Sequence, residues 1–453
     1  MRVFNRHVST RGVTLFAFET LLVSGLIVGT ASLHGSVDSG AMWKVLLATF
    51  LCELCFYYND LYDLTRVHPK GELLVRVLRA TGAAAVVLAA LSVVFPSARL
   101  GSGTLLTTIG ILAVTMPLCR VAFDGLTTDP HVEERVLVVG TGSIAATVAN
   151  HIRAQYDYAY RLVGFIEDQA GAGSGAAGPI LGAIDDLPGV IDAYSISRIV
   201  IALADRRGQL PIDDLLRAKL AGVRVEDAAT TYERMTGKIL VDDLKPSWLI
   251  FSDGFGASRA TRLVKRLVDF SGALLGTVLC APVMLLTALA VRLDSPGPVL
   301  YRQERVGENG RPFTLFKFRS MRTDAEQGTP IWAKDGDARA TRVGRFIRLT
   351  RLDELPQFWN VLRGEMSFVG PRPERPFFVQ QLAQAIPFYM ARHAVKPGVT
   401  GWAQVRYRYG ASVEDALEKL RYDLYYMKHL SIVFDLMILL DTVKVMVCRK
   451  GAQ

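Results

Sequence analysis

The chain has 453 residues, of which 50% are hydrophobic and 21% are charged. It is too long for one ordinary domain and too apolar for an ordinary soluble protein, which excludes a single soluble domain. The formal net charge of +9 suits nucleic acid, anionic lipid or a phosphorylated substrate, and charge alone does not choose among them.

Four apolar stretches occur early in the sequence. They comprise residues 13–33, 42–58, 75–95 and 103–118. Each is near the roughly 20 residues that cross a hydrocarbon core, so we expect a four-helix transmembrane anchor over residues 1–122. The first stretch is longer than the apolar core of a signal peptide and another span follows it, so we expect no cleavage.

Lysine and arginine collect on one side of these spans. The loop 34–40 has neither and the loop 96–102 has only Arg99, whereas the other side carries Arg2, Arg6, Arg11, Arg66, Lys70, Arg76, Arg79 and Arg120. Short cytoplasmic loops carry the positive excess, so we place both termini and everything after residue 120 in the cytoplasm. Glu53, inside the second stretch, is either a functional site or a residue near the membrane interface.

From residue 134 the pattern becomes strand, glycine turn and helix, with Gly140 and Gly142 in the turn. Such glycines let backbone N–H groups approach a phosphate at a helix N-terminus. Further strands at 162–166, 198–202 and 223–225 and a helix at 212–221 complete an expected α/β Rossmann-like cytoplasmic domain over residues 131–230, followed by a linker over 231–258.

This domain has no Tyr-x-x-x-Lys pair of the kind that a short-chain dehydrogenase uses, and its only lysine is Lys219. The sequence therefore favours a scaffold or dimerisation role, with ligand sensing or catalysis as alternatives. Gly140 and Gly142 would then form a vestigial nucleotide loop.

A fifth apolar run, residues 267–291, lies between two basic segments. A straight span would put these segments on opposite faces of the membrane, against the charge rule. Pro282 lacks an N–H and can break the helix, so that both ends return to one face. We expect a re-entrant helix over 265–292 in a mostly α catalytic domain over 259–453. A crossing helix with a proline kink is the alternative.

Arginines are dense between residues 302 and 375. Their planar forks match phosphate oxygens, so we expect a phosphorylated substrate at the membrane interface and no nucleic acid. Among them stand Asp353 and Glu354. A carboxylate can attack a phosphoryl group, with Mg²⁺ and arginines neutralising the charge. By itself, however, such a pair is more often a charge pair at a helix start.

Several separated blocks follow one another between about residues 265 and 447. They are Lys265-Arg-Leu-Val-Asp-Phe, Ser295-Pro-Gly-Pro, Gln303-Glu-Arg-Val-Gly, Phe316-Lys-Phe-Arg-Ser-Met, Asp353-Glu-Leu-Pro-Gln, Gly364-Glu-Met-Ser-Phe-Val-Gly-Pro-Arg-Pro and Lys396-Pro-Gly-Val-Thr-Gly-Trp-Ala-Gln. In this order they resemble the bacterial sugar transferases, also called polyprenyl-phosphate hexose-1-phosphate transferases or monotopic phosphoglycosyl transferases. The upstream spans and Rossmann-like domain are similar to the long form of this family, and residues 246–255 and 409–417 resemble its exosortase-associated (PEP-CTERM) exopolysaccharide branch.

The resemblance implies that Asp353 takes a hexose-1-phosphate covalently from a UDP-sugar, releases UMP, and passes the group to undecaprenyl phosphate to start exopolysaccharide synthesis. Glu354 would complete the dyad, and both carboxylates would hold Mg²⁺. Phosphate-binding residues would be Arg348, Arg372, Lys317 and Arg319. The family's helix break has serine before the proline, whereas Ala281 precedes Pro282 in this chain.

The resemblance also implies a multi-pass protein of the bacterial inner membrane, with its catalytic domain facing the cytoplasm and membrane lipids as partners. A homodimer is among the states that this interpretation allows. Two alternatives remain open: a nucleotide-sugar dehydratase or oxidoreductase using the Rossmann-like domain, and a non-enzymatic scaffold of a polysaccharide complex. No motif names the hexose.

Overall fold

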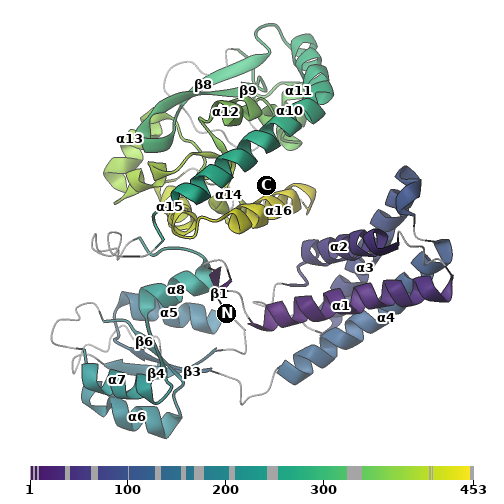
Figure 1. Ribbon diagram of the computed structural model, residues 1–453. Coiled ribbons are helices and arrows are strands. Elements are labelled where there is room, and N and C mark those ends of the chain that lie inside the picture. The colour runs from purple at the N-terminus through teal and green to yellow at the C-terminus, as the bar shows by residue number, and fades with distance from the viewer. Residues whose placement is uncertain are drawn as a thin grey trace. The chain divides into compact units, whose positions relative to one another are not determined.

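The structure is a computed structural model (Figure 1) that divides into two compact units, Met1–Thr231 and Tyr232–Gln453. The linker expected over 231–258 and the stretches 246–255 and 409–417 lie partly outside the described residues. Those residues are 2–3, 6–7, 10–35, 41–62, 70–99, 101–127, 134–154, 160–167, 178–203, 210–241, 252, 254–323, 339–407, 410 and 412–448.

Four long helices open the first unit and coincide with the four predicted spans. By length and apolar composition, the candidate membrane spans among the described residues are Gly12–Leu33, Gly71–Val94, Gly103–Phe123 and, from the second unit, Arg259–Asp294. The helix at the second predicted span carries Lys44 and Glu53. The elements are α1 (Thr10–Leu33), α2 (Ala41–Tyr58), α3 (Lys70–Val94), the short helix η1 (Pro96–Ala98) and α4 (Ser102–Thr127), preceded by the two-residue strands β1 (Arg2–Val3) and β2 (Arg6–His7).

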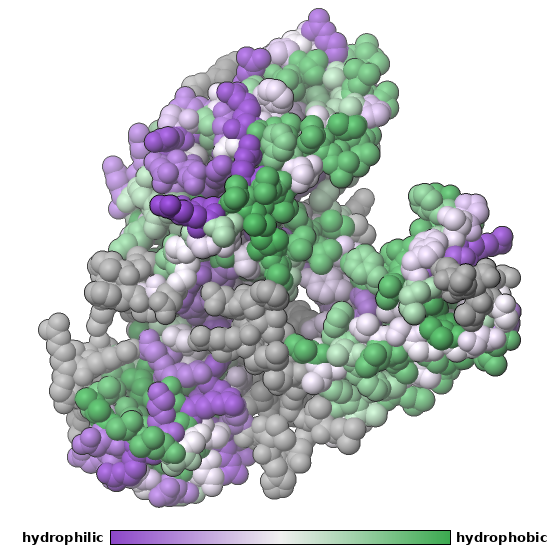
Figure 2. All heavy atoms as spheres, in the orientation of Figure 1, coloured by the Kyte–Doolittle hydropathy of each residue, from purple (hydrophilic) through white to green (hydrophobic). Residues whose placement is uncertain are grey.

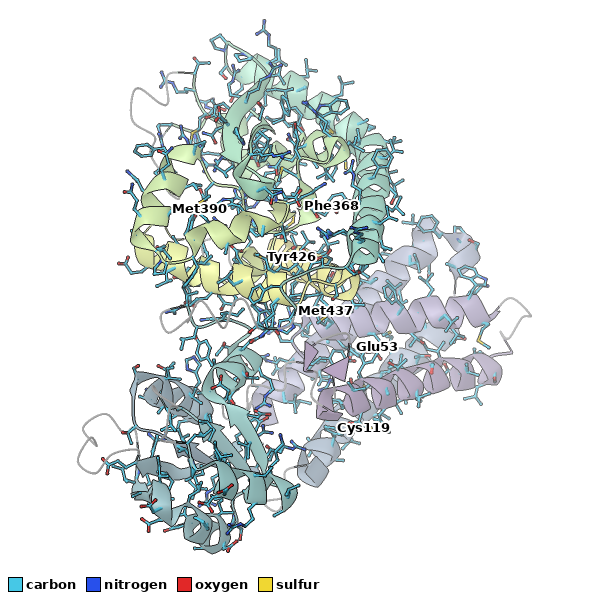
Figure 3. All side chains as sticks on the ribbon, turned by 60° about the vertical axis from the view of Figure 1, so that its left-hand side comes forward. Glu53, Cys119, Phe368, Met390, Tyr426 and Met437 are labelled. Atoms are coloured by element: carbon cyan, nitrogen blue, oxygen red, sulfur yellow. The ribbon has the colours of Figure 1, made fainter. Side chains whose placement is uncertain are left out.

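Buried polar side chains satisfy one another inside this bundle. Arg120 on α4 forms an ion pair with Glu19 on α1 (2.6 Å) and donates to the Leu61 carbonyl at 2.5 Å. Glu53, which Figure 3 places within the bundle, accepts hydrogen bonds from the Tyr62 hydroxyl and from Thr20. Lipid offers no such partners, so these contacts hold the turn after α2 against α1 and α4.

The rest of the first unit is a five-stranded parallel sheet of order β5-β4-β3-β6-β7. The chain moves outward from β3 in one direction and then returns to its other side, as in a Rossmann fold. The sequence missed β5 and α6, which are short. The elements are β3 (Glu134–Val139), α5 (Ser143–Ala154), β4 (Tyr160–Glu167), β5 (Ile180–Ala183), η4 (Ile184–Asp186), α6 (Leu187–Tyr194), β6 (Arg198–Ile201), α7 (Ile212–Leu220), β7 (Arg224–Asp227) and α8 (Ala228–Thr236).

The second unit is mainly helical and contains one antiparallel hairpin and one short parallel strand pair. Its largest buried cluster surrounds Trp402, whose indole donates to the Gly237 carbonyl at 2.9 Å. The elements are α10 (Arg259–Asp294), β8 (Leu300–Val306), η5 (Glu308–Gly310), β9 (Pro312–Phe318), α11 (Arg342–Leu349), η6 (Leu352–Glu354), α12 (Gln357–Arg363), β10 (Ser367–Val369), α13 (Pro376–Ala385), η7 (Tyr389–Ala394), β11 (Gly398–Thr400), α14 (Trp402–Arg406), α15 (Val413–Lys428) and α16 (Ile432–Cys448).

Helix α10 is helical at every position of its 36 residues, including Pro282. The break expected at Pro282 is therefore not present. The proline removes one backbone hydrogen bond but leaves the turns on either side intact, and neighbouring turns of a long apolar helix tolerate that loss. At about 1.5 Å per residue a straight helix of this size would be about 54 Å long.

Both ends of α10 are attached to the same unit. Near its start, Lys265 pairs with Asp435 of α16 at 2.5 Å, and Asp269 accepts a hydrogen bond from the Phe368 N–H at 3.0 Å. At its end, Asp294 accepts from the Val343 N–H of α11 at 3.1 Å. Tyr426, labelled in Figure 3, strengthens the first attachment by donating to Asp435 at 2.8 Å.

The other side of α10 is apolar and exposed, and Figure 2 shows hydrophobic residues gathered along it. An exposed apolar surface of this extent marks a contact with another apolar phase. The residues are Leu263, Leu267, Phe270, Leu274, Leu275, Val278, Leu279, Leu285, Leu286, Leu289 and Leu293.

Candidate active site

Asp353 and Glu354 lie in the one-turn helix η6, between α11 and α12. Two local features place this turn. Gly344 lets α11 approach the chain after β9, since a Cβ there would lie 1.9 Å from the Ser320 carbonyl oxygen. Arg351 adopts the left-handed conformation, with φ of 60°, directly after the C-cap of α11, and this residue separates α11 from η6.

Glu354 is held by three cations. Its Oε1 lies 2.8 Å from the Lys317 Nζ, 3.3 Å from an Arg372 Nη2 and 3.9 Å from the Arg351 Nη1. Burial acts to raise the pKa of Glu354, but the charges of Lys317, Arg372 and Arg351 outweigh it and hold that pKa well below its usual value. Glu354 is therefore a fixed anion.

Asp353 has a different environment. It is buried, with 7% of its surface exposed, and its Oδ1 has no hydrogen-bond partner among the described residues. Burial, opposed by Lys317 and aided by the Glu354 carboxylate, raises the pKa of Asp353. A buried carboxylate oxygen without a partner is costly unless something else binds it, so this oxygen is available to a reactant or a cation.

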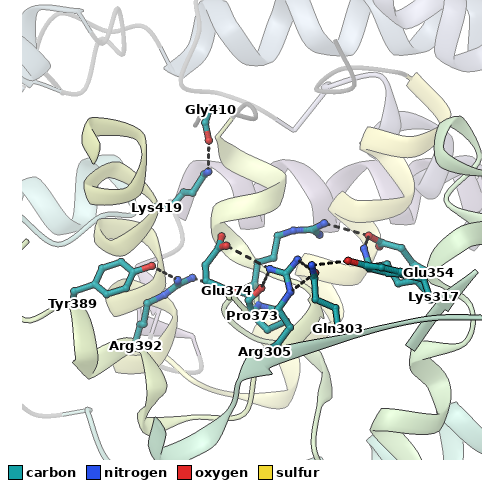
Figure 4. A network of polar contacts seen from close by, with 12 residues as sticks. Gln303, Arg305, Lys317, Glu354, Pro373, Glu374, Tyr389, Arg392, Gly410 and Lys419 are labelled. Atoms are coloured by element: carbon teal, nitrogen blue, oxygen red, sulfur yellow. Dashed lines mark hydrogen bonds and ion pairs between the residues drawn. The ribbon is translucent and has the colours of Figure 1, made fainter. Parts of the chain in front are cut away.

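Lys317 reaches the dyad from strand β9, which pairs with β8. The fully buried Asn360 of α12 fixes this strand beside the dyad, because its amide accepts from the Phe316 N–H at 3.1 Å and donates to the Thr314 carbonyl at 2.7 Å. Burial lowers the pKa of the Lys317 ammonium, although the nearby Glu354 carboxylate acts to raise it. Figure 4 shows Lys317 and Glu354 at one end of a larger polar network.

The predicted phosphate-binding residues divide into three groups. Lys317 and Arg372 converge on Glu354, and Arg372 keeps 35% of its side chain exposed. Arg348, in the last turn of α11, is half-buried, and within the described chain its guanidinium has no hydrogen bond or ion pair. Its charge is therefore free for a substrate phosphate.

Arg319 was predicted to bind phosphate, but the structure gives its side chain other partners. Its guanidinium is buried and donates to the Ser295 carbonyl (2.6 Å), the Ser295 hydroxyl (2.9 Å), the Pro296 carbonyl (3.0 Å) and the Val291 carbonyl (3.3 Å). These groups belong to the end of α10 and the turn after it. Arg319 therefore caps the long helix and does not face Asp353.

Sequence reasoning did not assign Arg351 and Asn360 to the site. The adjacency of Arg351 to the dyad was a usable signal, but its contact with Glu354 depends on a left-handed backbone that sequence does not reveal. Asn360 could have been suspected from its place in an otherwise apolar helical run, where a buried amide needs partners.

Removing the positive charge of Lys317 shifts the pH at which the dyad works. In Lys317→Met, both carboxylates lose an attractive cation, so their pKa values rise, and the protonated fraction of Asp353 increases at a given acidic pH. We expect the acidic limb of activity to move to higher pH. The measurement is the single-turnover rate as a function of pH. A lower maximal rate with the acidic limb at its wild-type pH would contradict the inferred effect of Lys317 on the two carboxylates.

In the first unit, Gly140 and Gly142 lie between β3 and α5. Gly140 has φ of 109°, and a Cβ there would lie 2.8 Å from the Ala202 carbonyl oxygen, so this glycine is needed for the sheet itself. Gly142 has no atom within 4 Å of an added Cβ, among the described residues. Open space at a helix start does not by itself identify a ligand.

Two family models match the chain. Residues 260–449, which include the dyad, match the model described as bacterial sugar transferase. Residues 58–217 match the model described as CoA-binding domain, which takes in two helices of the bundle and most of the parallel sheet.

Curated relatives match as well. The chain is 43% identical over 239 residues to a UDP-N-acetylgalactosamine-undecaprenyl-phosphate N-acetylgalactosaminephosphotransferase of Aeromonas hydrophila, covering 53% of this chain and 56% of that protein. It is 45% identical over 186 residues to a UDP-glucose:undecaprenyl-phosphate glucose-1-phosphate transferase of Caulobacter vibrioides, covering 41% and 70%. A protein of the same description from Xanthomonas campestris is 29% identical over 97% of this chain and 94% of its own length. The chain thus spans about half the length of the Aeromonas relative.

Proposed function

Because the chain belongs to the bacterial sugar transferase family, we propose that it transfers a hexose-1-phosphate from a UDP-sugar to undecaprenyl phosphate through a covalent intermediate on Asp353. The relatives' descriptions name undecaprenyl phosphate as the acceptor and UDP-sugars as donors. The product would be the lipid-linked sugar from which exopolysaccharide assembly starts.

One observation carries this proposal: the two adjacent carboxylates are made chemically unequal. Glu354 is neutralised by Lys317, Arg372 and Arg351, whereas the Oδ1 of Asp353 has no partner among the described residues. A saturated carboxylate is a poor nucleophile, and an unsolvated one is a strong nucleophile once it has lost its proton. This inequality supports Asp353 as the attacking group.

The proposed reaction has two displacements. An Asp353 oxygen attacks the sugar-bearing phosphorus of the UDP-sugar, the bond from that phosphorus to the UMP oxygen breaks, and UMP leaves with the electron pair. An oxygen of undecaprenyl phosphate then attacks the same phosphorus and releases the Asp353 carboxylate. Arg372 and Arg348 have exposed surface with which to hold the diphosphate during both steps.

The residues also suit a magnesium ion. Among the described residues no group of three or more acidic, histidine or cysteine side chains forms a complete metal cage. Mg²⁺ seldom needs one, because it commonly takes one or two carboxylates together with substrate phosphates and water. The unpartnered Asp353 Oδ1 and the adjacent Glu354 would hold it, and when bound it would neutralise charge on the diphosphate.

The membrane places the acceptor. We propose that the unbroken helix α10 lies along the cytoplasmic leaflet of the bacterial inner membrane, with its exposed apolar face in lipid, and does not cross the bilayer. Its two ends both contact one polar unit, through Lys265 and Asp294, and a polar unit cannot lie on both sides of a bilayer. Such a placement brings the dyad to the level of lipid phosphates.

The nucleotide product tests the proposed function. Membranes containing the full chain are incubated with undecaprenyl phosphate, Mg²⁺ and either UDP-glucose or UDP-N-acetylgalactosamine. We expect UMP and a lipid-linked sugar diphosphate with at least one donor, and without acceptor a stoichiometric sugar phosphate adduct on the protein. Release of UDP would mean ordinary glycosyl transfer and would overturn the proposal.

A further inference from the structure

The loop that carries Arg372 has no regular secondary structure, yet its backbone is held at four consecutive carbonyls. Those of Pro371, Arg372, Pro373 and Glu374 accept, in order, from the Gly398 N–H (2.9 Å), the Arg392 Nη2 (3.1 Å), the Arg305 Nη1 (2.9 Å) and the Val306 N–H (2.9 Å). Prolines at two of the four positions lack an N–H, so the loop cannot form a ladder of its own. External donors must hold it.

Two of these donors are arginine side chains, which are themselves anchored, as Figure 4 shows. Arg305 donates through Nε (3.0 Å) and Nη2 (2.6 Å) to the Gln303 amide oxygen and lies 3.5 Å from Glu374. With its remaining Nη1 it holds the Pro373 carbonyl. All three nitrogen atoms of the Arg305 guanidinium therefore have partners.

The second donor has a stronger anchor. Arg392 is buried, forms an ion pair with the buried Asp423 at 2.7 Å and donates to the Tyr389 hydroxyl at 2.8 Å. Its Nη2 also holds the carbonyl of Arg372 itself. Burying a charge pair is expensive, and apolar side chains could fill the same volume more cheaply, so stability alone gives weak reason for this arrangement.

We propose that Arg305 and Arg392 are positioning residues that hold the Pro371–Glu374 loop so that the Arg372 guanidinium is fixed beside Glu354 before substrate arrives. They hold the carbonyls of Arg372 and Pro373 and act on Arg372 through this backbone. The fixed guanidinium then meets the diphosphate at no further cost of ordering, which is where an oriented cation gains its effect. This inference rests on the proposed function and names further residues for that site.

The two lysine substitutions Arg305→Lys and Arg392→Lys keep the charge but lose the planar fork, so they cannot hold two partners and the loop together. Arg392→Lys also leaves Asp423 with a cation, which limits unfolding. We expect kcat/KM for UMP release to fall about 10- to 100-fold in each variant, the usual effect of an ångström-scale misplacement. The matched control is Arg266→Lys, which loses a fork that holds the Val361 and Leu362 carbonyls (2.6 and 2.7 Å), away from the loop.

A double-mutant cycle with Arg372→Gln separates positioning from general damage. If Arg305 and Arg392 act through Arg372, their lysine variants change kcat/KM by no more than about twofold in the Arg372→Gln background. The same 10- to 100-fold loss in that background, or wild-type kinetics in the single variants, would overturn the inference. A wild-type protein that releases no UMP would instead reject the proposed function.

Discussion

Asp353→Asn abolishes sugar-phosphate transfer while the protein remains folded and able to bind its donor. We expect UMP release to fall at least about 10⁴-fold, because the amide cannot attack phosphorus and no neighbouring group can replace it. Glu354, adjacent in sequence, is occupied by Lys317 and Arg372. The measurement is UMP release per protein together with mass spectrometry of the sugar phosphate adduct, which should be absent.

The matched control is Glu354→Gln, which removes a carboxylate one residue away. It should leave a smaller but measurable rate and a detectable adduct, since Asp353 is still present and only the charge balance around it is changed. If Asp353→Asn retained the adduct, or if the two variants lost activity equally with no adduct in either, Asp353 would not be the nucleophile.

Hydropathy predicted the large elements well. The four predicted spans are apolar runs whose length matches the thickness of a bilayer. Most strands of the parallel sheet are continuous apolar runs because the sheet is buried on both faces. Strand β5 was missed because it is an edge strand that contains Gly182 and is not buried, unlike the equally short β6, and α6 was missed because eight residues are few for a helical pattern.

The sequence predicted the charged residues of the site, and it was right about their place for some of them and wrong for others. Lys317 and Arg372 are far apart in sequence, and the structure brings both onto Glu354. In a continuing strand Arg319 would share the face of Lys317, two residues before it, but β9 ends at Phe318 and the Arg319 side chain lies against the end of α10. An arginine in such a basic segment can donate either to a substrate phosphate or to backbone carbonyls, and the residue type alone does not decide between them.

Because Arg319 caps α10, we expect its replacement to lower the stability of the protein strongly and to leave the chemical step unchanged. In Arg319→Met, the three carbonyls and one hydroxyl that the guanidinium now holds at the end of α10 lose their donor; the Val291 carbonyl is left in a buried place, and the Ser295 and Pro296 acceptors in partly buried ones. An unsatisfied buried acceptor costs about 1–3 kcal/mol, and the partly buried acceptors cost less because water can reach them, so we expect about 3 kcal/mol of destabilisation in total. For a unit of this size that lowers the midpoint of thermal inactivation by about 6–12 °C.

The comparison is with Arg302→Met on the neighbouring strand β8. Arg302 is exposed and contacts only the Phe316 ring among the partners in the described chain, with 5.7 Å between its Cζ and the ring centroid. Its loss should shift the midpoint by no more than about 2 °C. Residual UMP release after heating gives both midpoints, and KM for the donor at low temperature should stay at the wild-type value in both. A raised KM with an unchanged midpoint in Arg319→Met would return Arg319 to the phosphate-binding residues, because only a side chain that reaches substrate alters donor binding without altering the end of α10.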